Sequence, residues 1–347
     1  MTSGRHPPDP APHRPLPAAE LNEETELLAL LADGEFRSGE WLAGRLGISR
    51  AGIWKRVGKL AERGIALERV SGRGYRVPGG IELLDRERIA AALPERVRAQ
   101  LSRFELRRVV DSTNALVLEG LRAGTLGHGA VVFAEQQTSG RGRRGRRWVS
   151  PFGCNIYCSF AWRFDAGVAA LEGLSLVIGM AAVRALARVG ARGVMLKWPN
   201  DLVAGAAKLG GILIEIDGEL AGPVTAVIGV GINVSMPPGA ATDIEQSWTD
   251  LEAVCGARVG RNALAAVLLE SCLDVLGDFA RYGFGHFATE WDRVDALRGL
   301  EVSVLAGSGP GVQGIANGID ASGALRLMTS EGEQLLSGGE TSVRRNG

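Results

Sequence analysis

Residues 137–148 read Gln137-Thr138-Ser139-Gly140-Arg141-Gly142-Arg143-Arg144-Gly145-Arg146-Arg147-Trp148. Five of the seven residues from 141 to 147 are arginines, and glycines separate them. Arginines at this density cannot pack in a core and need anions, and glycine lets backbone N–H groups come close to a phosphate. Trp148 can stack on a flat base. We therefore predict a loop between two strands that is mobile when empty and closes over a phosphorylated ligand.

Two other interpretations of this arginine–glycine loop (residues 140–148) remain at this point. Arginine–glycine segments also bind RNA, although they usually occur in long low-complexity repeats and this one occurs once. A solvated surface loop would show the same residues without any ligand.

Three elements further along the chain carry lysines or glycine pairs next to apolar strands. Lys197–Asp201, with the sequence Lys-Trp-Pro-Asn-Asp, follows one strand and begins a turn. Paired glycines begin a second strand in Lys208–Leu213, and Gly229–Asn233 repeats glycine inside a third. Glycine in a strand often marks a place where a ligand approaches the backbone. Two lysines alone would indicate surface charge, but the three elements together predict a binding site.

The sequence around these motifs divides into four parts. Residues 1–18 are rich in proline and predict a disordered tail; residues 19–80 predict a winged helix-turn-helix, residues 81–296 a mixed α/β domain, and residues 297–347 a small β-barrel. The predicted fold class is therefore multidomain α+β. Beyond residue 80, we expect helices at Leu174–Val189 and Ala263–Phe279 and strands at Ala130–Ala134, Ile156–Ala161, Gly211–Ile216, Thr225–Ile232, Glu301–Leu305, Gln313–Ile319, Ala324–Met328 and Glu333–Leu336.

The N-terminal part shows three short helices and a hairpin. Serine at the N-cap and glycine at the end are common signals of helix ends. The predicted elements are a first helix with a leucine face that ends before Gly34, a second from a Ser38 cap to Gly47, a third from a Ser49 cap to Gly64, and a hairpin of Leu67–Val70 with Tyr75–Val77.

Residues 49–76 concentrate positive charge, with eight basic and two acidic side chains and a net charge of +6. The whole chain has 39 basic and 39 acidic side chains, so any affinity for DNA must come from such a local concentration. In a helix-turn-helix the second helix of the pair lies in the major groove, and flanking basic residues hold phosphates. We predict DNA binding by a dimer that reads two half-sites, with a basic protein-docking module as the alternative. The predicted DNA-binding residues are Ser49, Arg50, Trp54, Lys55, Arg56 and Arg73.

The remaining composition bears on metal binding and location. Cys154 and Cys158 are four apart in an apparent strand and share a face, but they lack a second ligand pair, so we expect buried free thiols and no protein metal site. The N-terminus has no apolar signal region, and we expect no stretch of the ~18 apolar residues that a membrane span needs. These features predict a cytoplasmic protein with no membrane partner.

Taken together, the motifs resemble those of the biotin–protein ligase family. The matching blocks, in the family's order and at similar spacing, are Asp111–Asn114, Gly140–Arg146, Lys197–Asp201, Lys208–Leu213 and Gly229–Val234. Ser38–Arg50 and Ser71–Val77 resemble the bifunctional members, which also repress biotin synthesis genes. The resemblance covers nearly everything beyond the proline-rich tail. It implies a central biotin/lipoate-ligase-like catalytic domain and a C-terminal barrel of the Src-homology-3 (SH3) kind.

The resemblance also implies a reaction and its residues. Biotin would be activated with ATP and Mg²⁺ as biotinyl-5′-AMP and then transferred to a lysine of a biotin carboxyl carrier protein. The implied catalytic residues are Lys208, Arg143, Lys197 and Asp201, with Mg²⁺ arriving with ATP near Asp201. The implied biotin-binding residues are Ser112, Thr113, Asn114, Gln137, Arg141, Gly142, Arg143, Lys208, Gly211 and Leu213, and the nucleotide-binding residues are Trp148, Asn200 and Asn233.

The implied partners are the carrier protein, operator DNA and a second copy of the chain, which would join on adenylate or DNA binding. Two features depart from the family pattern. Trp54 stands where a smaller polar residue is usual, which puts the operator preference in question, and the loop from Ile216 to Val224 is short, which does the same for its part in closing over adenine. A lipoate ligase and a biotin sensor without catalysis are the alternatives from other classes.

Overall fold

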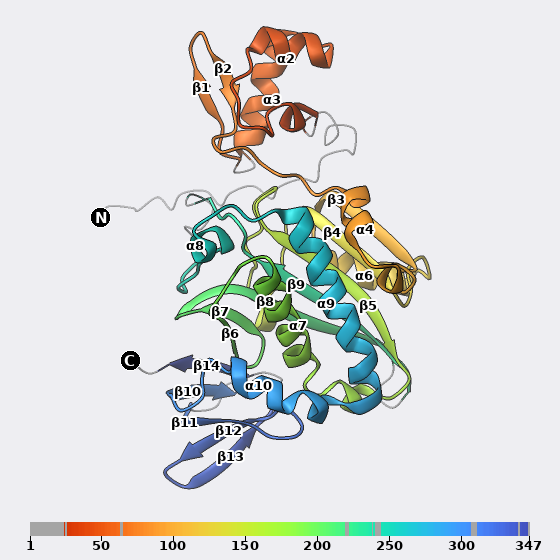
Figure 1. Ribbon diagram of the computed structural model, residues 1–347, viewed down its shortest axis with the longest axis vertical. Helices are drawn as coiled ribbons and strands as arrows, with labels where there is room; N and C mark the ends of the chain where they lie inside the picture. The colour runs from red at the N-terminus through yellow and green to blue at the C-terminus, as the bar shows by residue number, and fades with distance from the viewer. Residues whose placement is uncertain are drawn as a thin grey trace, which may run out of the picture.

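The computed structural model describes residues 24, 26–62, 65–218, 222–237, 239, 244–306, 311–338 and 341–345. The expected tail at residues 1–18 lies outside these ranges, as does Gly64, which the sequence predicts to end the third helix. Three parts follow one another along the long axis of the molecule in Figure 1: a small helical module, a central α/β domain and a C-terminal β-sheet.

The N-terminal module (residues 24–77) contains helical residues 26–30, α2 (Gly39–Leu46), α3 (Arg50–Glu62), and a hairpin of β1 (Glu68–Val70) and β2 (Gly74–Arg76), within one residue of the expected strands. The predicted caps are confirmed. The Ser38 hydroxyl accepts a hydrogen bond from the Trp41 N–H at 3.0 Å, and the Ser49 hydroxyl accepts one from the Gly52 N–H at 3.1 Å. Gly47 ends α2 with φ of 64°, a conformation that favours glycine. The module's own aliphatic core includes the fully buried Leu27, Leu28, Leu31, Leu42 and Ile53.

Buried polar contacts fix the chain just after this module to the central domain. Arg261 is only 3% exposed and donates hydrogen bonds to the backbone carbonyls of Glu82 and Asn155, both at 2.7 Å. It also donates to the fully buried carboxylate of Glu135 at 2.7 Å. Phe152, which belongs to the central domain, packs within the aliphatic core of the N-terminal module. The junction therefore combines one inserted ring with a closed set of ionic and carbonyl contacts.

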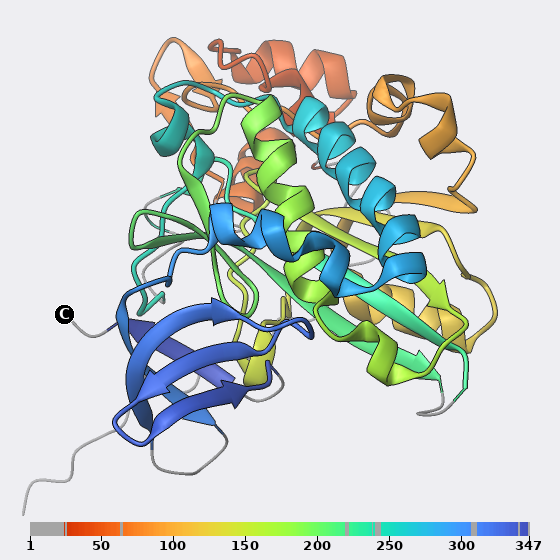
Figure 2. The ribbon, with the colours of Figure 1, turned by 60° about the horizontal axis from the view of Figure 1, so that its bottom comes forward.

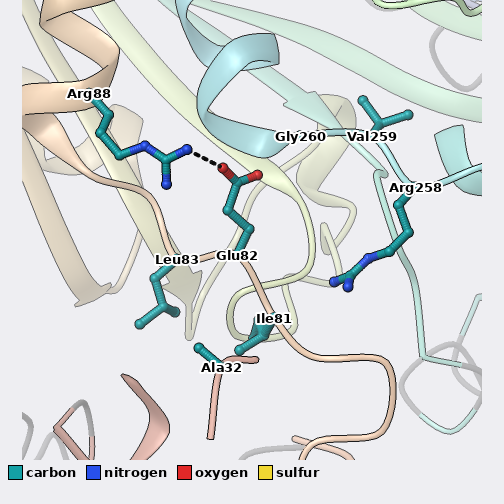
Figure 3. Close-up of a pocket in the computed structure, with 8 residues that line it drawn as sticks. All are labelled: Ala32, Ile81, Glu82, Leu83, Arg88, Arg258, Val259 and Gly260. Carbon is teal, nitrogen blue, oxygen red and sulfur yellow. Dashed lines mark ion pairs between the residues drawn. The ribbon is translucent and has the colours of Figure 1, made fainter. Parts of the chain in front are cut away.

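A cavity of about 340 Å³ lies beside the junction (Figure 3), lined by Ala32, Ile81, Glu82, Leu83, Arg88, Arg258, Val259 and Gly260. Glu82 points toward Arg88 in this view, and the two side chains form an ion pair at 3.4 Å. Arg258 donates to the carbonyl of Gly80 at 3.1 Å, which ties the chain leaving the N-terminal module to the segment before the helix α9 (Arg261–Tyr282).

The central domain is built on one seven-stranded sheet. Its strands are β3 (Arg103–Val110), β4 (Ala130–Gln137), β5 (Ile156–Phe164), β6 (Val194–Lys197), β7 (Asp201–Ala204), β8 (Ala207–Gly218) and β9 (Val224–Ile232), in the order β3-β4-β5-β9-β8-β7-β6. β3 and β4 are parallel, joined by the crossover helix α6 (Thr113–Arg122), and the other neighbours are antiparallel. The predicted strands are confirmed and mostly longer than expected, and β3 and β7 were not predicted.

Helices cover both faces of the sheet. α7 (Leu174–Arg188) and α9 (Arg261–Tyr282) lie side by side on one face, as Figure 2 shows, and α6 packs on the other. Side chains along β4 point alternately to the two faces of the sheet. Val131 and Phe133 belong to the core under α7 and α9, whereas Val132 belongs to the smaller core under α6. The remaining helical segments are α4 (Arg86–Ala92), α5 (Glu95–Arg98), η1 (Arg143–Gly145), η2 (Val168–Leu171), α8 (Leu251–Cys255), η4 (Phe284–Phe287) and α10 (Ala288–Val294).

One expectation about apolar stretches is wrong. Val168–Arg188 is long and apolar enough, by length and composition alone, to cross a membrane, although the sequence was expected to hold no such stretch. Half of it is buried in the protein, and α7 packs against α9 and the sheet. The composition of this segment is that of a core helix covered on most sides.

The C-terminal part (residues 297–345) is an antiparallel sheet of β10 (Glu301–Ala306), β11 (Val312–Ile319), β12 (Leu325–Thr329), β13 (Gly332–Leu336) and β14 (Thr341–Arg345), in the order β13-β12-β11-β10-β14. The four predicted strands are confirmed, β14 was not predicted, and closure into a barrel stays a prediction. Its inner residues, such as Val302 and Leu327, continue the core of the central domain. The indole of Trp198 donates to the carbonyl of Gly323 at 3.0 Å across this boundary.

The cysteines are placed differently from the expectation in one respect. Cys154 lies in the turn before β5, so it does not share a strand face with Cys158. Cys158 and Cys272 are buried free thiols, and Cys154 and Cys255 are half-buried. Burial raises the pKa of Cys154 to about 11 and that of Cys272 to about 12. Such thiols stay protonated near neutral pH and are poor nucleophiles and metal ligands.

Candidate active site

One row of strand pairings carries four candidate residues across the central sheet. Lys197 on β6 is opposite Asp201 on β7, and Asp201 is in turn opposite Gly211 on β8. Gly211 is opposite Gly231 on β9. Residues directly opposite one another on neighbouring strands point to the same face of a sheet. Lys197 and Asp201 therefore lie next to two glycines, Gly211 and Gly231, which leave the backbone uncovered. All four are on the face of the sheet that α6 covers elsewhere.

Lys208 reaches the same face because β8 contains a bulge. The pairing of β7 with β8 shifts just before Gly210, which makes Leu209 an extra residue. Strict alternation from Gly211 would point Lys208 to the opposite face; the bulge turns it toward Asp201 instead, and Leu209 is fully buried in the core. The Lys208 Nζ lies 2.6 Å from the Asp201 Oδ1.

A cavity of about 920 Å³ opens over this row. All fifteen residues implied for catalysis, biotin and nucleotide line it: Ser112, Thr113, Asn114, Gln137, Arg141, Gly142, Arg143, Trp148, Lys197, Asn200, Asp201, Lys208, Gly211, Leu213 and Asn233. They come from segments up to about a third of the chain apart, and the fold brings them to one place. Their individual roles stay a prediction.

Two glycines of β9 let side chains approach the sheet closely. A Cβ at Gly229 would lie 2.3 Å from the Asn114 Oδ1, and one at Gly231 would lie 2.8 Å from the ring of Trp148. Contacts this short essentially never occur, so neither position accepts a side chain without displacing its neighbour. The Trp148 ring thus rests against the strand, with the Nζ of Lys208 5.5 Å from its centroid.

The start of α6 is held by hydrogen bonds to three strands. The backbone N–H and the hydroxyl of Thr113 donate to the Gln137 Oε1 at 2.9 and 3.1 Å. The Ser159 Oγ on β5 lies 2.7 Å from the Thr113 hydroxyl and 2.6 Å from the Asn114 Oδ1. The Asn114 amide also donates to the Glu215 carboxylate at 2.8 Å. Hydroxyl and amide groups are therefore fixed together at this part of the cavity, which suits a neutral polar ligand head.

The arginine–glycine loop is held from two sides. Arg141 forms an ion pair with Glu215 on β8 at 3.0 Å. Arg143 donates to the Asn200 Oδ1 at 3.2 Å and to the carbonyl of Gly338 in the C-terminal part. The loop therefore bridges the central sheet and the C-terminal sheet at the mouth of the cavity.

The cavity carries an excess of positive charge. Among the described residues that line it, nine are lysines or arginines and two, Asp201 and Glu245, are acidic. Burial lowers the pKa of the Lys197 ammonium, with Asp201 acting in the opposite direction and Lys208 adding to the decrease. Burial likewise lowers the pKa of the Arg143 guanidinium. Charged groups that are disfavoured in this way are stabilised when an anion binds beside them, so the cavity is suited to anionic ligands.

Sequence reasoning missed several groups at this site. Glu215 and Ser159 were read only as strand positions, and residues 244–248 carry no periodic pattern. The backbone of that segment nevertheless pairs with Lys208, whose N–H donates to the carbonyl of Ser247 at 2.9 Å. The C-terminal strand β14 adds Thr341, Val343, Arg344 and Arg345 to the lining. The only signal for β14 was its pair of arginines.

The short loop after Ile216 is partly outside the described residues. β8 extends to Gly218, and residues 219–221 are not described. The part of this loop in closing over adenine therefore stays an open prediction.

The predicted DNA-binding residues lie on α3 and at the tip of the hairpin. Ser49, Arg50, Trp54, Lys55 and Arg73 are exposed, and Arg56 is half-buried. The guanidinium of Arg73 lies 4.0 Å from the ring centroid of Phe36, so the hairpin turn contacts Phe36 through this side chain. Exposed cations on both a helix and a hairpin suit contacts to a phosphate backbone.

Comparison with known proteins identifies the family. Residues 22–76 match the helix-turn-helix (HTH) domain family, residues 106–233 match the biotin/lipoate A/B protein ligase family, and residues 299–344 match the biotin protein ligase C-terminal domain. The bifunctional ligase/repressor BirA of Salmonella typhimurium is 42% identical over 318 residues, which cover 92% of this chain and 96% of the relative. The chain belongs to the bifunctional biotin ligase/repressor family. The Escherichia coli BirA is 40% identical over 319 residues, again covering 92% of this chain and 96% of the relative.

A solved member of the ligase family shares the catalytic fold. The biotin protein ligase from Aquifex aeolicus in complex with biotin and ATP superposes with a TM-score of 0.60 at 28% identity, and the match covers 71% of this chain and all of that one. This biotin ligase/repressor is thus a biotin–protein ligase that carries a helix-turn-helix DNA-binding domain, as the resemblance implied. The relatives favour biotin over lipoate.

Proposed function

We propose that the protein activates biotin with ATP to give biotinyl-5′-AMP and then transfers biotin to a lysine of a biotin carboxyl carrier protein. In the first step a carboxylate oxygen of biotin attacks the α-phosphorus of ATP, and pyrophosphate leaves. In the second step the amine of the acceptor lysine attacks the carbonyl carbon of the mixed anhydride and loses a proton, and AMP leaves. Neither step needs a side-chain nucleophile, which agrees with the protonated state of the buried thiols.

The observation that carries this proposal is the excess of fixed cations in one cavity. A carboxylate and a triphosphate repel each other, and more charge develops on phosphate oxygens as the bond forms. Lys208, Lys197 and Arg143 would offset that repulsion, because they are held in place before the substrates arrive. Asp201 would keep Lys208 oriented through the ion pair between them.

The other residues of the cavity divide between the two substrates. We assign Ser112, Thr113, Asn114 and Gln137 to the ureido head of biotin, since their polar groups are gathered at the start of α6. Gly211 and Leu213 would lie against the biotin tail, and Arg141, Gly142 and Arg143 would line the carboxylate and phosphate. Trp148 would cover adenine, and Asn200 and Asn233 would lie near the nucleotide phosphates.

Mg²⁺ would enter with ATP near Asp201. Proteins commonly hold Mg²⁺ through one or two carboxylates together with substrate phosphates. Asp201 offers one such carboxylate in the cavity, and the part of the chain that the structure describes has no group of three or more His, Cys, Asp or Glu side chains that could hold a metal alone. Bound there, the ion would neutralise phosphate charge.

We further propose that the protein is a biotin-responsive repressor that binds operator DNA as a homodimer. Between Ile214 and Gly218, β8 pairs with β9 alone among the described strands, so its other edge is open, and Ile216 there is 40% exposed. An open strand edge can pair with the same strand of a second copy. For biotin supply to control DNA binding, the adenylate must bind the dimer more tightly than the monomer. We expect both activities in the cytoplasm.

Transfer of labelled biotin to a purified carboxyl carrier domain tests the ligase function. With ATP and Mg²⁺ the acceptor should become labelled, and without ATP it should not. Labelled lipoate in a parallel reaction is the control for the related acid. Preference for lipoate, or no nucleotide-dependent uptake of biotin, would contradict the assignment.

A gel shift tests the repressor function. Deletion of residues 1–78 should abolish binding to operator DNA, because the predicted contacts all lie in that part of the chain. A shift that survives this deletion would contradict the role of the N-terminal module. A monomer mass in saturating biotin and ATP would contradict the adenylate-linked dimer.

A further inference from the structure

α3 presents an apolar stripe to solvent. Ala51, Trp54 and Gly58 recur at three- and four-residue spacing, so they lie along one face of the helix. All three are exposed, and Trp54 is 61% exposed. Ile53 and Leu60 lie on the other side of the helix and are buried in the core of the N-terminal module. The indole of Trp54 therefore contributes little to the packing of its own domain.

A second exposed tryptophan in the same module shows the difference. Trp41 on α2 is 42% exposed, and the guanidinium groups of Arg37 and Arg45 lie 5.4 and 5.6 Å from its ring centroid. Two cations thus lie close to the ring of Trp41. For Trp54 there is no comparable ring or cation contact within the described ranges. Trp54 is an indole whose surface is available to a partner.

The charges around the stripe identify the kind of partner. Arg50 and Lys55 are exposed on α3 beside Trp54, and Arg69 and Arg73 are exposed on the hairpin. Cations on two neighbouring elements fit the two phosphate strands that border a groove of DNA. The apolar stripe between them would then face the base edges. At Gly58 a Cβ would meet nothing within 4 Å of the protein, so a bare backbone at this point leaves room for close approach to a partner.

The chemistry of the apolar stripe indicates which base it contacts. Asparagine, glutamine and arginine read adenine or guanine through pairs of hydrogen bonds, and none of these stands at positions 51, 54 or 58. The apolar feature of the major groove is the C5-methyl group of thymine. We propose that Trp54, with Ala51 beside it, selects thymine through contact with this methyl group and is a specificity-determining residue of the module. The inference rests on the proposed repressor function.

Replacing thymine by deoxyuridine tests the inference, because it removes the methyl group and keeps the pairing with adenine. Duplexes are first selected with the full-length protein, in the presence of biotin, ATP and Mg²⁺, from a library of random double-stranded DNA. The best duplex is then resynthesised with deoxyuridine at each thymine in turn. Loss of one buried methyl group should weaken binding by the parent protein by about fourfold at one or two positions of each half-site.

Variants at the two tryptophans make the test specific. Trp54→Ala should bind thymine and deoxyuridine duplexes equally at those positions, and Trp54→Phe should keep part of the discrimination. Trp41→Ala is the matched control and should discriminate as the parent does. The midpoint of thermal unfolding shows that each variant is folded.

The outcomes separate the inference from the function on which it rests. Selection that enriches no duplex would overturn both the repressor function and the inference. An enriched duplex that tolerates deoxyuridine at every thymine would overturn the inference alone. Full discrimination by Trp54→Ala would also overturn it, because the methyl group would then be read by another residue.

Discussion

Two ion pairs in the central domain show how a structural contact differs from a functional one. Glu135 and Arg261 are almost completely buried, and the guanidinium has carboxylate and carbonyl acceptors on all sides. Asp201 and Lys208 are close in distance, but each is nearly a fifth exposed, and lysines and arginines outnumber acidic residues among the described residues that line the cavity around them. The charges of the first pair are therefore neutralised by groups of the protein itself. The second pair lies in a cavity whose lining has an excess of positive charge, which suits an anionic ligand.

The largest effect should follow from breaking the first pair. Glu135→Ala leaves the Arg261 charge buried without its carboxylate, which typically costs about 3–5 kcal/mol of unfolding free energy. Urea unfolding measures this loss. The double variant Glu135→Ala with Arg261→Met should recover part of it, because the unpaired charge is then gone. A single variant within about 1 kcal/mol of the parent would show that this pair does not stabilise the junction.

Breaking the functional pair should affect catalysis more than stability. Lys208→Ala removes a cation that would stabilise the transition state, so adenylate formation should fall by roughly a hundredfold, or ~3 kcal/mol. Release of pyrophosphate measures the rate. Arg163→Ala is a control, since Arg163 is exposed near the end of β5 and, within the part of the chain that the structure describes, its ion pair is with Asp165. A loss under about threefold in Lys208→Ala would contradict its role.

The arginine–glycine loop offers a smaller, kinetic test. Arg143→Gly removes the contacts to Asn200 and to Gly338, so the loop should no longer retain the adenylate. A charged hydrogen bond contributes about 1.5–3 kcal/mol, so labelling of a bystander protein by released adenylate should rise by at least about tenfold. If the variant labels no more bystander protein than the parent, the loop is not a lid.

The smallest effect is a dependence of stability on pH. Burial lowers the pKa of Lys197 from 10.5, so the native state binds this proton less tightly than the unfolded chain does. The unfolding free energy should therefore rise with pH between the lowered pKa and about 10.5, by at most about 1.4 kcal/mol per pH unit for a single proton. Thermal unfolding across this window should show the rise in the parent and lose it in Lys197→Met. Bound adenylate should also suppress it, because an anion favours the charged lysine.

Local signals made the helix-turn-helix and most of the central sheet predictable. The caps at Ser38 and Ser49 are encoded within three residues of where they act, and they hold in the structure. The short motifs of lysines, arginines and glycines predicted a binding site, and the individual members of the cavity were implied by the resemblance of these motifs to the biotin–protein ligase family. In each of these cases the informative residues are neighbours in the sequence.

Contacts between residues far apart in the chain could not be predicted from the sequence. The bulge at Leu209 depends on how β7 and β8 align, and without it Lys208 would point to the opposite face. The ion pair of Glu135 with Arg261 joins residues 126 apart, and neither residue type indicates burial by itself. β14 and residues 244–248 have no pattern of their own, because their positions are set by the strands against which they pair.

Phe152 connects the cavity to the N-terminal module through a short segment of the chain. Only three residues along the chain lie between Trp148, whose ring lines the cavity, and Phe152, whose ring is buried in the core of the N-terminal module. The four residue-to-residue steps from Trp148 to Phe152 span at most about 14 Å when fully extended, so the two rings cannot move far apart. A ligand that displaces the Trp148 ring would strain this short segment or shift the core of the N-terminal module, against which α3 packs.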